Sequence, residues 1–355
     1  MTDPGGSGSE VPVRLAALPA EPLVTVLTAV YNGADHVADT VESVRHQSYP
    51  RIEHLLIDDG STDDTIAVLD GLGDSPVELR VVSIENRGQT GAFNVGFDHA
   101  RGAILLFLDA DDQFLPDKVA RCVDALRDHP NAGLVQHQLL EVDNDGTELD
   151  VYPPLSPVAN GWLGSDALRS GGIIAGMSAT SALGIRREIV DLVAPLDESF
   201  RAGDMALVGL VPLITEIAGI QEPLSTYRWH GGNITFSEKL TVESVRWRLD
   251  MMQALLDSQR TFLAERYPDL LDQLAPPEAS RYLAELEYIR ARLEDSPDAP
   301  ALYDRLRSTP AYHDQQVVRR RFWDLAPKLP DRAFLGVLDG LARPGRWRRS
   351  ISAVT

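Results

Sequence analysis

The regular alternation of apolar runs with amphipathic segments is the feature that most constrains how this chain folds. Each apolar run has the length of a buried strand, and each following segment has the spacing of a helix. The expected strands span residues 23–30, 52–58 and 77–84, a fourth ends at 109, and the helices between them end near 47, 69 and 100. This repetition predicts an α/β, Rossmann-like fold with a mainly parallel sheet and helices on both faces.

The alternation weakens after residue 131, where the chain becomes richer in proline and glycine. We expect strands at 133–142 and 220–227, separated by a loop-rich passage at 152–172 and a helix at 203–218. The last of these strands returns the chain to the sheet.

This pattern divides the chain into three expected parts. Residues 1–20 are rich in Gly, Ser and Pro, lack the apolar core of a signal peptide and are expected to be disordered. Residues 21–236 are expected to form the α/β domain. Residues 237–355 are expected to form a helical region, because apolar residues such as Val245, Leu249 and Met252 recur on one helical face. No apolar run approaches the length of a membrane span.

Charge and cysteine content exclude several classes of function. The chain has 33 Lys and Arg residues against 53 Asp and Glu residues, which gives a formal net charge of -20. Such a field opposes nucleic acid, so an anionic substrate has to be held locally, for example by a metal ion. Cys122 is the lone cysteine, which excludes an internal disulfide and predicts a packing role in a reducing compartment.

A carboxylate cluster, Asp109-Ala110-Asp111-Asp112, follows the apolar run Ile104–Leu108. The carboxyl end of a parallel strand is where open α/β sheets bind ligands. Crowded carboxylates repel one another unless a cation lies between them, and a hard divalent ion shared with phosphate oxygens meets that need. The cluster therefore predicts a metal-bound phosphate, and the alternative is a solvated acidic loop that caps the next helix.

Polar residues also follow the first two strands. Thr28, Tyr31 and Asn32 supply a hydroxyl, a ring and an amide at the expected sheet edge, where such a rim can hold a nucleobase. Asp58 and Asp59 end the second strand and can accept hydrogen bonds from a ligand.

The turn after the third strand, Glu85-Asn86-Arg87-Gly88, offers a cation and close backbone approach to a diphosphate. The first strand-helix turn lacks the glycine spacing of a dinucleotide fingerprint.

Taken together, these motifs resemble the family 2 glycosyltransferases of the GT-A fold. The resemblance covers roughly residues 23–236 in order and spacing, and rests on segments 28–32, 58–61, 86–88 with 94–96, 108–112 and 226–235. It implies a nucleotide-sugar donor, with a UDP-sugar as the favoured form, and Mg²⁺ or Mn²⁺ on its diphosphate. The implied donor-site residues are Thr28, Val30, Tyr31, Asn32, Asp58, Asp59, Arg87, Asp109, Ala110 and Asp111. The implied metal ligands are Asp111, Asp109 and His230.

The resemblance also implies the chemistry and its catalytic base. An inverting displacement needs a carboxylate that accepts the proton of the attacking hydroxyl, and the family position matches Asp204. Gly203 stands where relatives usually carry glutamate, and Phe93 stands where many carry arginine. The family usually lines its sugar and acceptor pocket with the segment that contains Thr180 and Ser181. The alternative role for Asp204 is a helix cap.

Two other functions remain open at this point, a nucleotidyltransferase and a non-catalytic scaffold that binds nucleotide. For a transferase, the expected acceptor is a carbohydrate, a lipid-linked glycan or a small molecule.

The basic C-terminus, with Arg343, Arg346, Arg348 and Arg349 around Trp347, is either a solvated end or a contact for a membrane surface, where each basic residue contributes about 1 kcal/mol. The helical region is also a candidate for homodimerisation. The expected location is the cytoplasm, free or peripheral at the inner face of the membrane.

Overall fold

Strands that bury side chains on both faces form the centre of the molecule. The computed structural model describes residues 11–152, 157–170, 172, 174, 176–200, 202–230, 240–309, 312 and 317–342. In strand β1 (Val24–Val30), Val24 and Val26 pack on one side of the sheet with Cys122, whereas Leu27 packs on the other side with Phe97. This burial on both faces explains why the strand reads as a continuous apolar run.

One eight-stranded sheet holds all the strands of the described residues. Its order is β3-β2-β1-β4-β7-β5-β6, and β8 pairs with β5. The bounds are β1 Val24–Val30, β2 Ile52–Asp58, β3 Glu78–Ser83, β4 Ile104–Phe107, β5 Ala132–Val142, β6 Glu148–Tyr152, β7 Leu183–Arg186 and β8 Glu216–Arg228. Strands β3, β2, β1 and β4 are parallel, as the sequence predicts. The second half is mixed, because β7 runs antiparallel to both β4 and β5, and β6 runs antiparallel to β5.

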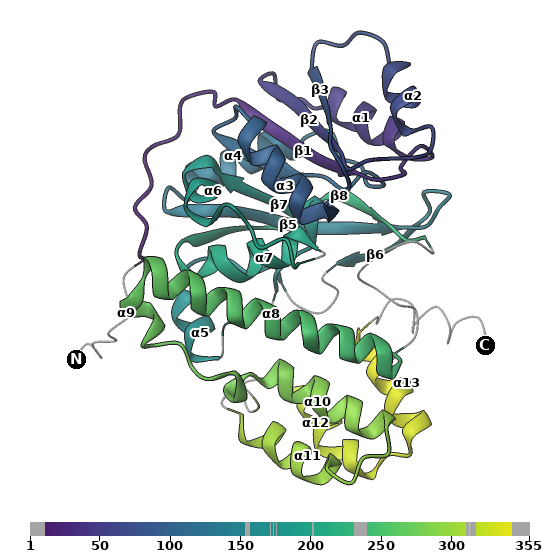
Figure 1. Ribbon diagram of the computed structural model, residues 1–355, viewed down its shortest axis with the longest axis vertical. Coiled ribbons are helices and arrows are strands. Elements are labelled where there is room, and N and C mark those ends of the chain that lie inside the picture. The colour runs from purple at the N-terminus through teal and green to yellow at the C-terminus, as the bar shows by residue number, and fades with distance from the viewer. Residues whose placement is uncertain are drawn as a thin grey trace.

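Helices cover both faces of the sheet, as Figure 1 shows. Residues of α1 and α4 pack on the face with Val24, and residues of α3, α6 and α7 pack on the face with Leu27. The bounds are α1 Val37–Arg45, α2 Thr65–Asp70, α3 Gly88–His99, α4 Lys118–Asp128, α5 Gly164–Arg169, α6 Arg187–Val193 and α7 Gly203–Leu210. The expected α/β architecture is confirmed.

The helix expected at 203–218 is shorter in the structure. Helix α7 ends at Leu210, a 3₁₀ turn spans Val211–Leu213, and β8 already begins at Glu216. Pro212 lies in that turn and cannot donate the backbone hydrogen bond that a continuing α-helix requires.

The described part of the expected leader packs against the α/β domain. Val13 N donates to Ile214 O at 3.2 Å, and Ala16 N donates to Glu188 Oε2 at 3.3 Å. Figure 1 shows this segment running along the side of the domain. The expected disorder of residues 1–20 is therefore wrong for residues 11–20, because local composition does not report these long-range contacts. Residues 1–10 lie outside the described residues.

A bundle of helices follows the sheet domain and shares its core. It contains α8 Val242–Arg266, α9 Pro268–Leu271, α10 Arg281–Leu293, α11 Ala299–Ser308, α12 Val317–Leu325 and α13 Asp331–Ala342. On α8, Gln259 Nε2 donates to Gly172 O at 2.7 Å and to Gly209 O at 2.8 Å. Tyr288, Trp323 and Phe334 form an aromatic centre of the bundle. None of the described helices is long and apolar enough to cross a membrane. The basic residues 343–349 lie outside the described residues.

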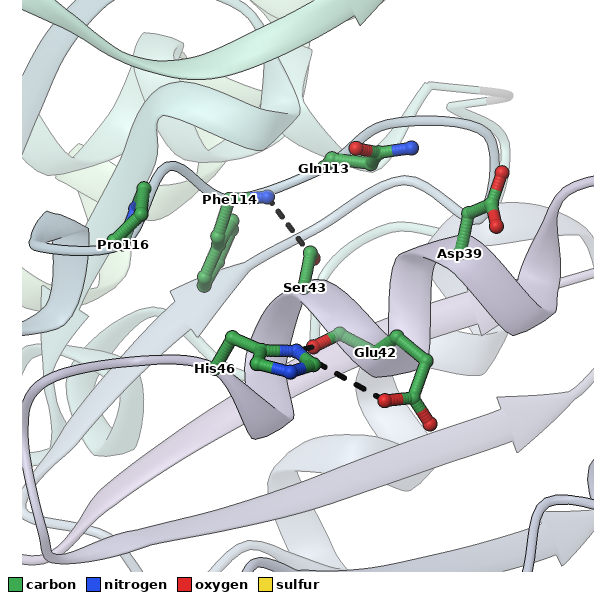
Figure 2. A pocket seen from close by; sticks show the side chains of 7 residues that line it. All are labelled: Asp39, Glu42, Ser43, His46, Gln113, Phe114 and Pro116. Carbon is green, nitrogen blue, oxygen red and sulfur yellow. Dashed lines mark hydrogen bonds and ion pairs between the residues drawn. The ribbon is translucent and has the colours of Figure 1, made fainter.

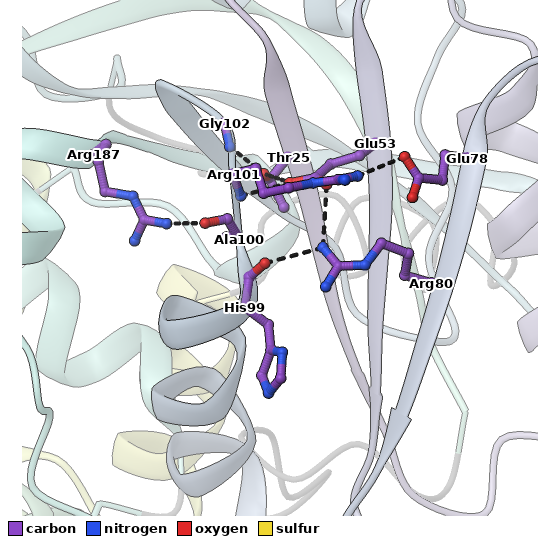
Figure 3. Close-up of polar contacts among 9 residues, drawn as sticks. All are labelled: Thr25, Glu53, Glu78, Arg80, His99, Ala100, Arg101, Gly102 and Arg187. Carbon is purple, nitrogen blue, oxygen red and sulfur yellow. Dashed lines mark hydrogen bonds and ion pairs between the residues drawn. The ribbon is translucent and has the colours of Figure 1, made fainter.

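The buried carboxylate of Glu53 links the amino end of β2 to the amino end of β1 and to the chain before β4. These contacts lie at the opposite end of β2 from Asp58. Glu53 of β2 is 1% exposed and accepts from Thr25 Oγ1 at 2.6 Å and from Arg101 N at 2.7 Å (Figure 3). The guanidinium groups of Arg101 and Arg80 approach its other oxygen at 2.6 and 3.3 Å. Burial would raise the pKa of Glu53, but these hydrogen bonds and charges hold it below its usual value.

Candidate active site

The carboxyl ends of β1, β2 and β4 meet at one edge of the sheet. Val30 and Asp58 lie side by side in the register of β1 and β2, and Asp59 N donates to Val30 O at 2.8 Å. Leu108, which directly precedes Asp109, donates its N–H to Leu27 O at 3.1 Å. The structure therefore brings together the turns that the sequence singled out on three separate strands.

Asp109 lies at the centre of this edge and is held by two neighbours. Its Oδ1 accepts from Gln89 Nε2 at 2.8 Å, and its N–H donates to Ser181 Oγ at 3.0 Å. Burial, followed by the charges of Asp112, Asp111 and Asp204, raises the pKa of Asp109 well above its usual value. Crowded carboxylates of this kind are stabilised by a bound cation.

Asp111 and His230 form a pair beside Asp109. The distance between His230 Nε2 and Asp111 Oδ2 is 2.7 Å, and both side chains are partly exposed. The Asp111 carboxylate, which accepts a hydrogen bond from the protonated imidazole, raises the pKa of His230. The sequence hypothesis that joined His230 to Asp111 thus has a geometric basis, since the two residues are 119 positions apart.

Asp112 is buried and supports the turn. Its Oδ1 accepts from Arg228 N at 2.8 Å and its Oδ2 accepts from Ser181 Oγ at 2.5 Å. Ser181 O in turn accepts from Lys118 Nζ at 2.7 Å, and burial lowers the pKa of Lys118 to about 7. The sequence pattern did not single out Lys118 or Arg228, because they act through backbone atoms that are distant in sequence. Ala110 contributes its carbonyl, which accepts from Thr40 Oγ1 at 2.8 Å.

Asp204 occupies the first turn of α7 and faces the same cluster. Burial raises its pKa, whereas hydrogen bonds from Met205 N and from Thr180 lower it in part. Thr180 also hydrogen-bonds to Asp109, so one residue contacts both carboxylates. The net pKa is raised, which makes Asp204 a stronger base than an exposed aspartate.

Fewer residues at the end of β1 are available to a nucleobase than the sequence hypothesis predicts. Thr28 is fully buried, and its hydroxyl lies 3.0 Å from His54 Nε2. Val30 is buried as well, packed in the core under α1. Both side chains are buried on the face of the sheet that also carries Val24 and Val26, so neither is exposed at the edge. Tyr31 is 54% exposed and remains on the rim.

Asn32 joins the first two strand-helix turns. It adopts a φ of 53°, and its Oδ1 accepts from Thr62 N at 2.8 Å and from Asp63 N at 3.3 Å. Its own N–H donates to Ser61 Oγ at 2.9 Å. These bonds fix the turn on which Tyr31 lies.

The two adjacent acids of β2 differ in their bonding. Both oxygens of Asp59 accept from backbone groups, from Arg87 N at 2.7 Å and from Gly88 N at 2.8 Å. Within the part of the chain that the structure describes, the Asp58 carboxylate accepts one hydrogen bond, to Oδ1 from Ser61 N at 3.0 Å. Asp59 therefore positions the start of α3, and Asp58 keeps more capacity for a ligand.

Arg87, expected near a diphosphate, forms an ion pair with Glu198. Its Nε also donates to Glu198 Oε2 at 3.2 Å. Glu198 precedes α7 in the chain, so this pair joins the α3 turn to the approach to α7.

A surface groove of about 250 Å³ lies between α1 and residues 113–116 (Figure 2). It is lined by Asp39, Glu42, Ser43, His46, Gln113, Phe114 and Pro116. Phe114 N donates to Ser43 Oγ at 3.0 Å. The groove is therefore formed where the segment that contains Phe114 packs against α1. The carboxylates of Asp109, Asp111 and Asp204 do not line it.

The residues of the edge suit a divalent cation that is shared with a ligand. Within the described ranges, no three His, Cys, Asp or Glu side chains form a metal-binding group by themselves. Mg²⁺ commonly binds through one or two carboxylates together with substrate phosphates. Asp111 and Asp109 supply carboxylate oxygens, the donor type that Mg²⁺ and Mn²⁺ prefer, and the imidazole of His230 lies beside Asp111.

The sheet order and the carboxylate edge define an α/β protein of the GT-A type. The structure is similar to S. aureus TarS 1–349 in complex with UDP, with a TM-score of 0.53 at 15% identity over 91% of this chain and 87% of that one. It is also similar to the mannosyltransferase PcManGT from Pyrobaculum calidifontis in complex with GDP-Man and Mn²⁺, with a TM-score of 0.52 at 20% identity over 96% and 86% of the two chains.

Residues 25–191 match the model of glycosyl transferase family 2, and the chain belongs to this family. An uncharacterized glycosyltransferase of Nostoc sp. is 33% identical over 213 residues, which are 59% of this chain and 66% of that protein. The E. coli enzyme UDP-Glc:alpha-D-GlcNAc-diphosphoundecaprenol beta-1,3-glucosyltransferase WfaP is 38% identical over 101 residues, 28% of this chain and 39% of its own length. The matches thus span two thirds or less of these relatives.

Proposed function

We propose that this chain transfers a sugar from a nucleotide-diphosphate sugar to an acceptor hydroxyl. The observation that carries the proposal is the convergence of Asp109, Asp111 and Asp204 at one sheet edge, with the pKa of Asp109 and of Asp204 raised. Carboxylates at this edge suit both the leaving diphosphate, through a cation, and the incoming hydroxyl.

On the donor side, Tyr31 and Asp58 face the nucleoside, and Asp109 and Asp111 lie toward the ribose and diphosphate. Asp111, Asp109 and His230 would hold Mg²⁺ or Mn²⁺ together with the donor. The ion supplies charge stabilisation for the departing diphosphate. A UDP-sugar is the favoured donor. The TarS complex contains UDP and WfaP is named for UDP-Glc, which supports testing UDP-sugars first.

On the acceptor side, Asp204 accepts the proton of the attacking hydroxyl as the new glycosidic bond forms and the bond to the diphosphate breaks. Direct displacement of this kind inverts the anomeric carbon. The acceptor belongs to the carbohydrates, lipid-linked glycans or small molecules. Peripheral membrane contact and homodimerisation remain proposals for the C-terminal region, as does the cytoplasmic location.

The test is a binding panel of nucleoside diphosphates and nucleotide sugars, each with Mn²⁺, with Mg²⁺ and with chelator. A ligand at 100 times its Kd stabilises the folded state by about 2.7 kcal/mol, which a thermal-shift assay detects. We expect stabilisation by one nucleotide that depends on metal and is lost in Asp111→Ala. Asp124→Ala, an exposed acid on α4, is the matched control.

Two results would contradict the proposal. Absence of any response to nucleotide would favour a scaffold of another kind. Release of pyrophosphate in place of a nucleoside diphosphate would identify a nucleotidyltransferase.

A further inference from the structure

Side chains of helix α3 hydrogen-bond to residues 196–200, which precede helix α7 and the proposed base Asp204. Asn94 exchanges two hydrogen bonds with the backbone of Leu196, at 2.9 and 2.8 Å. Thr90 Oγ1 donates to Phe200 O at 2.6 Å. Together with the Arg87–Glu198 ion pair, these contacts attach residues 196–200 to α3 before the chain enters α7.

Gln89 of α3 contacts the first residue of α7 and also contacts Asp109, the proposed donor carboxylate. Its Oε1 accepts from Gly203 N at 2.9 Å, and its Nε2 donates to Asp109 Oδ1 at 2.8 Å. Gly203 directly precedes Asp204. A single amide side chain therefore bridges the carboxylate of the donor side and the backbone that carries the base.

The fit between α3 and α7 leaves little freedom at this point. A Cβ at Gly203 would lie 2.5 Å from Phe93 Cδ2, closer than real Cβ contacts allow. Phe93 is 1% exposed and packs against Phe107 with ring centroids 5.0 Å apart, so it has no room to withdraw. The glycine thus lets the start of α7 lie directly on the aromatic ring, within reach of the Gln89 amide.

We propose that Gln89 is a positioning residue that couples donor binding at Asp109 to the placement of Asp204. The proposal rests on the proposed function, because it assigns the donor to Asp109 and the base to Asp204. A terminal amide fits the role because it donates on one side and accepts on the other. When a donor and its cation bind beside Asp109, the same amide is held in the orientation that fixes the Gly203 N–H.

Two substitutions separate the two halves of the bridge. Gln89→Met keeps the length of the side chain and removes both hydrogen bonds. Gln89→Glu keeps an acceptor for Gly203 N but loses the donor to Asp109 and places a second charge beside it. Gln221→Met is the matched control, because Gln221 bridges N and O of Val158, both at 3.0 Å, on β8.

The amide of Gly203 is a direct reporter, measured by hydrogen exchange in the free protein and with UDP plus Mn²⁺. In free Gln89→Met we expect its exchange to rise about tenfold, as one hydrogen bond is lost, whereas in Gln89→Glu it stays within about threefold of wild type. UDP plus Mn²⁺ should slow exchange over residues 203–207 in wild type and in Gln221→Met, but not in either Gln89 variant.

Turnover gives a second readout that a purely structural role would not produce. With the donor selected by the binding panel, kcat of Gln89→Met should fall about 10- to 100-fold while the KM for donor stays within about threefold, since misplacement of a base affects the chemical step. Gln221→Met should keep both values.

The failures are distinguishable. If Gly203 remains protected in Gln89→Met, or UDP plus Mn²⁺ protects residues 203–207 equally in wild type and both Gln89 variants, the coupling is wrong while the proposed function stands. If the wild type binds no nucleotide, the proposed function fails and the coupling fails with it.

Discussion

At the scale of single residues, the structure brings together several carboxylates that the sequence singled out and gives some of them structural partners. Asp109, Asp111, Asp204 and His230 meet, although they come from three distant parts of the chain. The motif could not show that the oxygens of Asp59 accept from two backbone N–H groups and those of Asp112 from Arg228 N and the Ser181 hydroxyl, because those partners come from other elements.

Asp204→Asn tests the assignment of the base. The amide keeps the shape of the side chain but cannot take up the proton, so we expect turnover to fall about 10²- to 10⁴-fold. The Kd for UDP with Mn²⁺ should change by less than about threefold, because the carboxylate acts on the acceptor side. Release of nucleoside diphosphate measures the first quantity and calorimetry the second. Normal turnover in Asp204→Asn would assign the residue to helix capping.

At the scale of elements, the sequence predicted the parallel half of the sheet well. Strands β1, β2 and β4 are buried on both faces, and their apolar runs are unmistakable. Strand β7 was missed because its four residues lie inside an apolar stretch without helix or strand periodicity, and β6 because it mixes acidic and apolar residues. Their pairing depends on β5, which lies between them in the sheet.

Glu53 makes the stability of the strand ends depend on pH. Because the pKa of Glu53 is lower in the folded protein than its usual value of 4.5, its stabilisation is fully present above that value and is lost as the pH falls further. We expect Glu53→Gln to cost about 1.5–3 kcal/mol at pH 7, since the Thr25 hydroxyl, the Arg101 N–H and the partly exposed guanidinium groups of Arg101 and Arg80 lose their charged partner. The difference from wild type should shrink below about pH 4, because protonation removes the same charge from wild type.

Urea unfolding at several pH values measures this effect. Glu78→Gln is the control, since Glu78 lies at the exposed end of the same network and pairs with Arg101 at 2.5 Å. Such an exposed pair contributes about 0–1 kcal/mol. Equal losses for the two variants would contradict the role given to Glu53.

At the scale of the whole molecule, the helical region and the sheet share one hydrophobic core. Met252, Leu255 and Leu256 of α8 belong to the same buried cluster as Leu27 and Phe107 of the sheet. The change of periodicity near residue 236 predicts helices beyond it, and the elements of the described residues from Val242 onward are all helices. The shared core could not be predicted, because an apolar helical face does not show what it packs against.

Deletion of residues 241–355 should therefore expose a core rather than release a separate domain. Leu255 covers Gly209 so closely that a Cβ there would lie 2.2 Å from its Cδ1. We expect the shortened protein to aggregate or to bind a hydrophobic dye with weakened near-UV circular dichroism. Cooperative unfolding of the shortened chain with native-like spectra would show that the two parts are independent.

The contacts of α3 with residues 196–203 have a consequence for protein engineering. Donor and acceptor preferences would ordinarily be altered separately, by grafting one loop at a time from a relative. Here the helix that contacts Asp109, the proposed donor carboxylate, also contacts the segment on the proposed acceptor side through Asn94, Thr90 and Gln89. A graft that replaces residues 196–204 has to bring the matching face of α3 with it, so this pair of segments forms the smallest exchangeable unit.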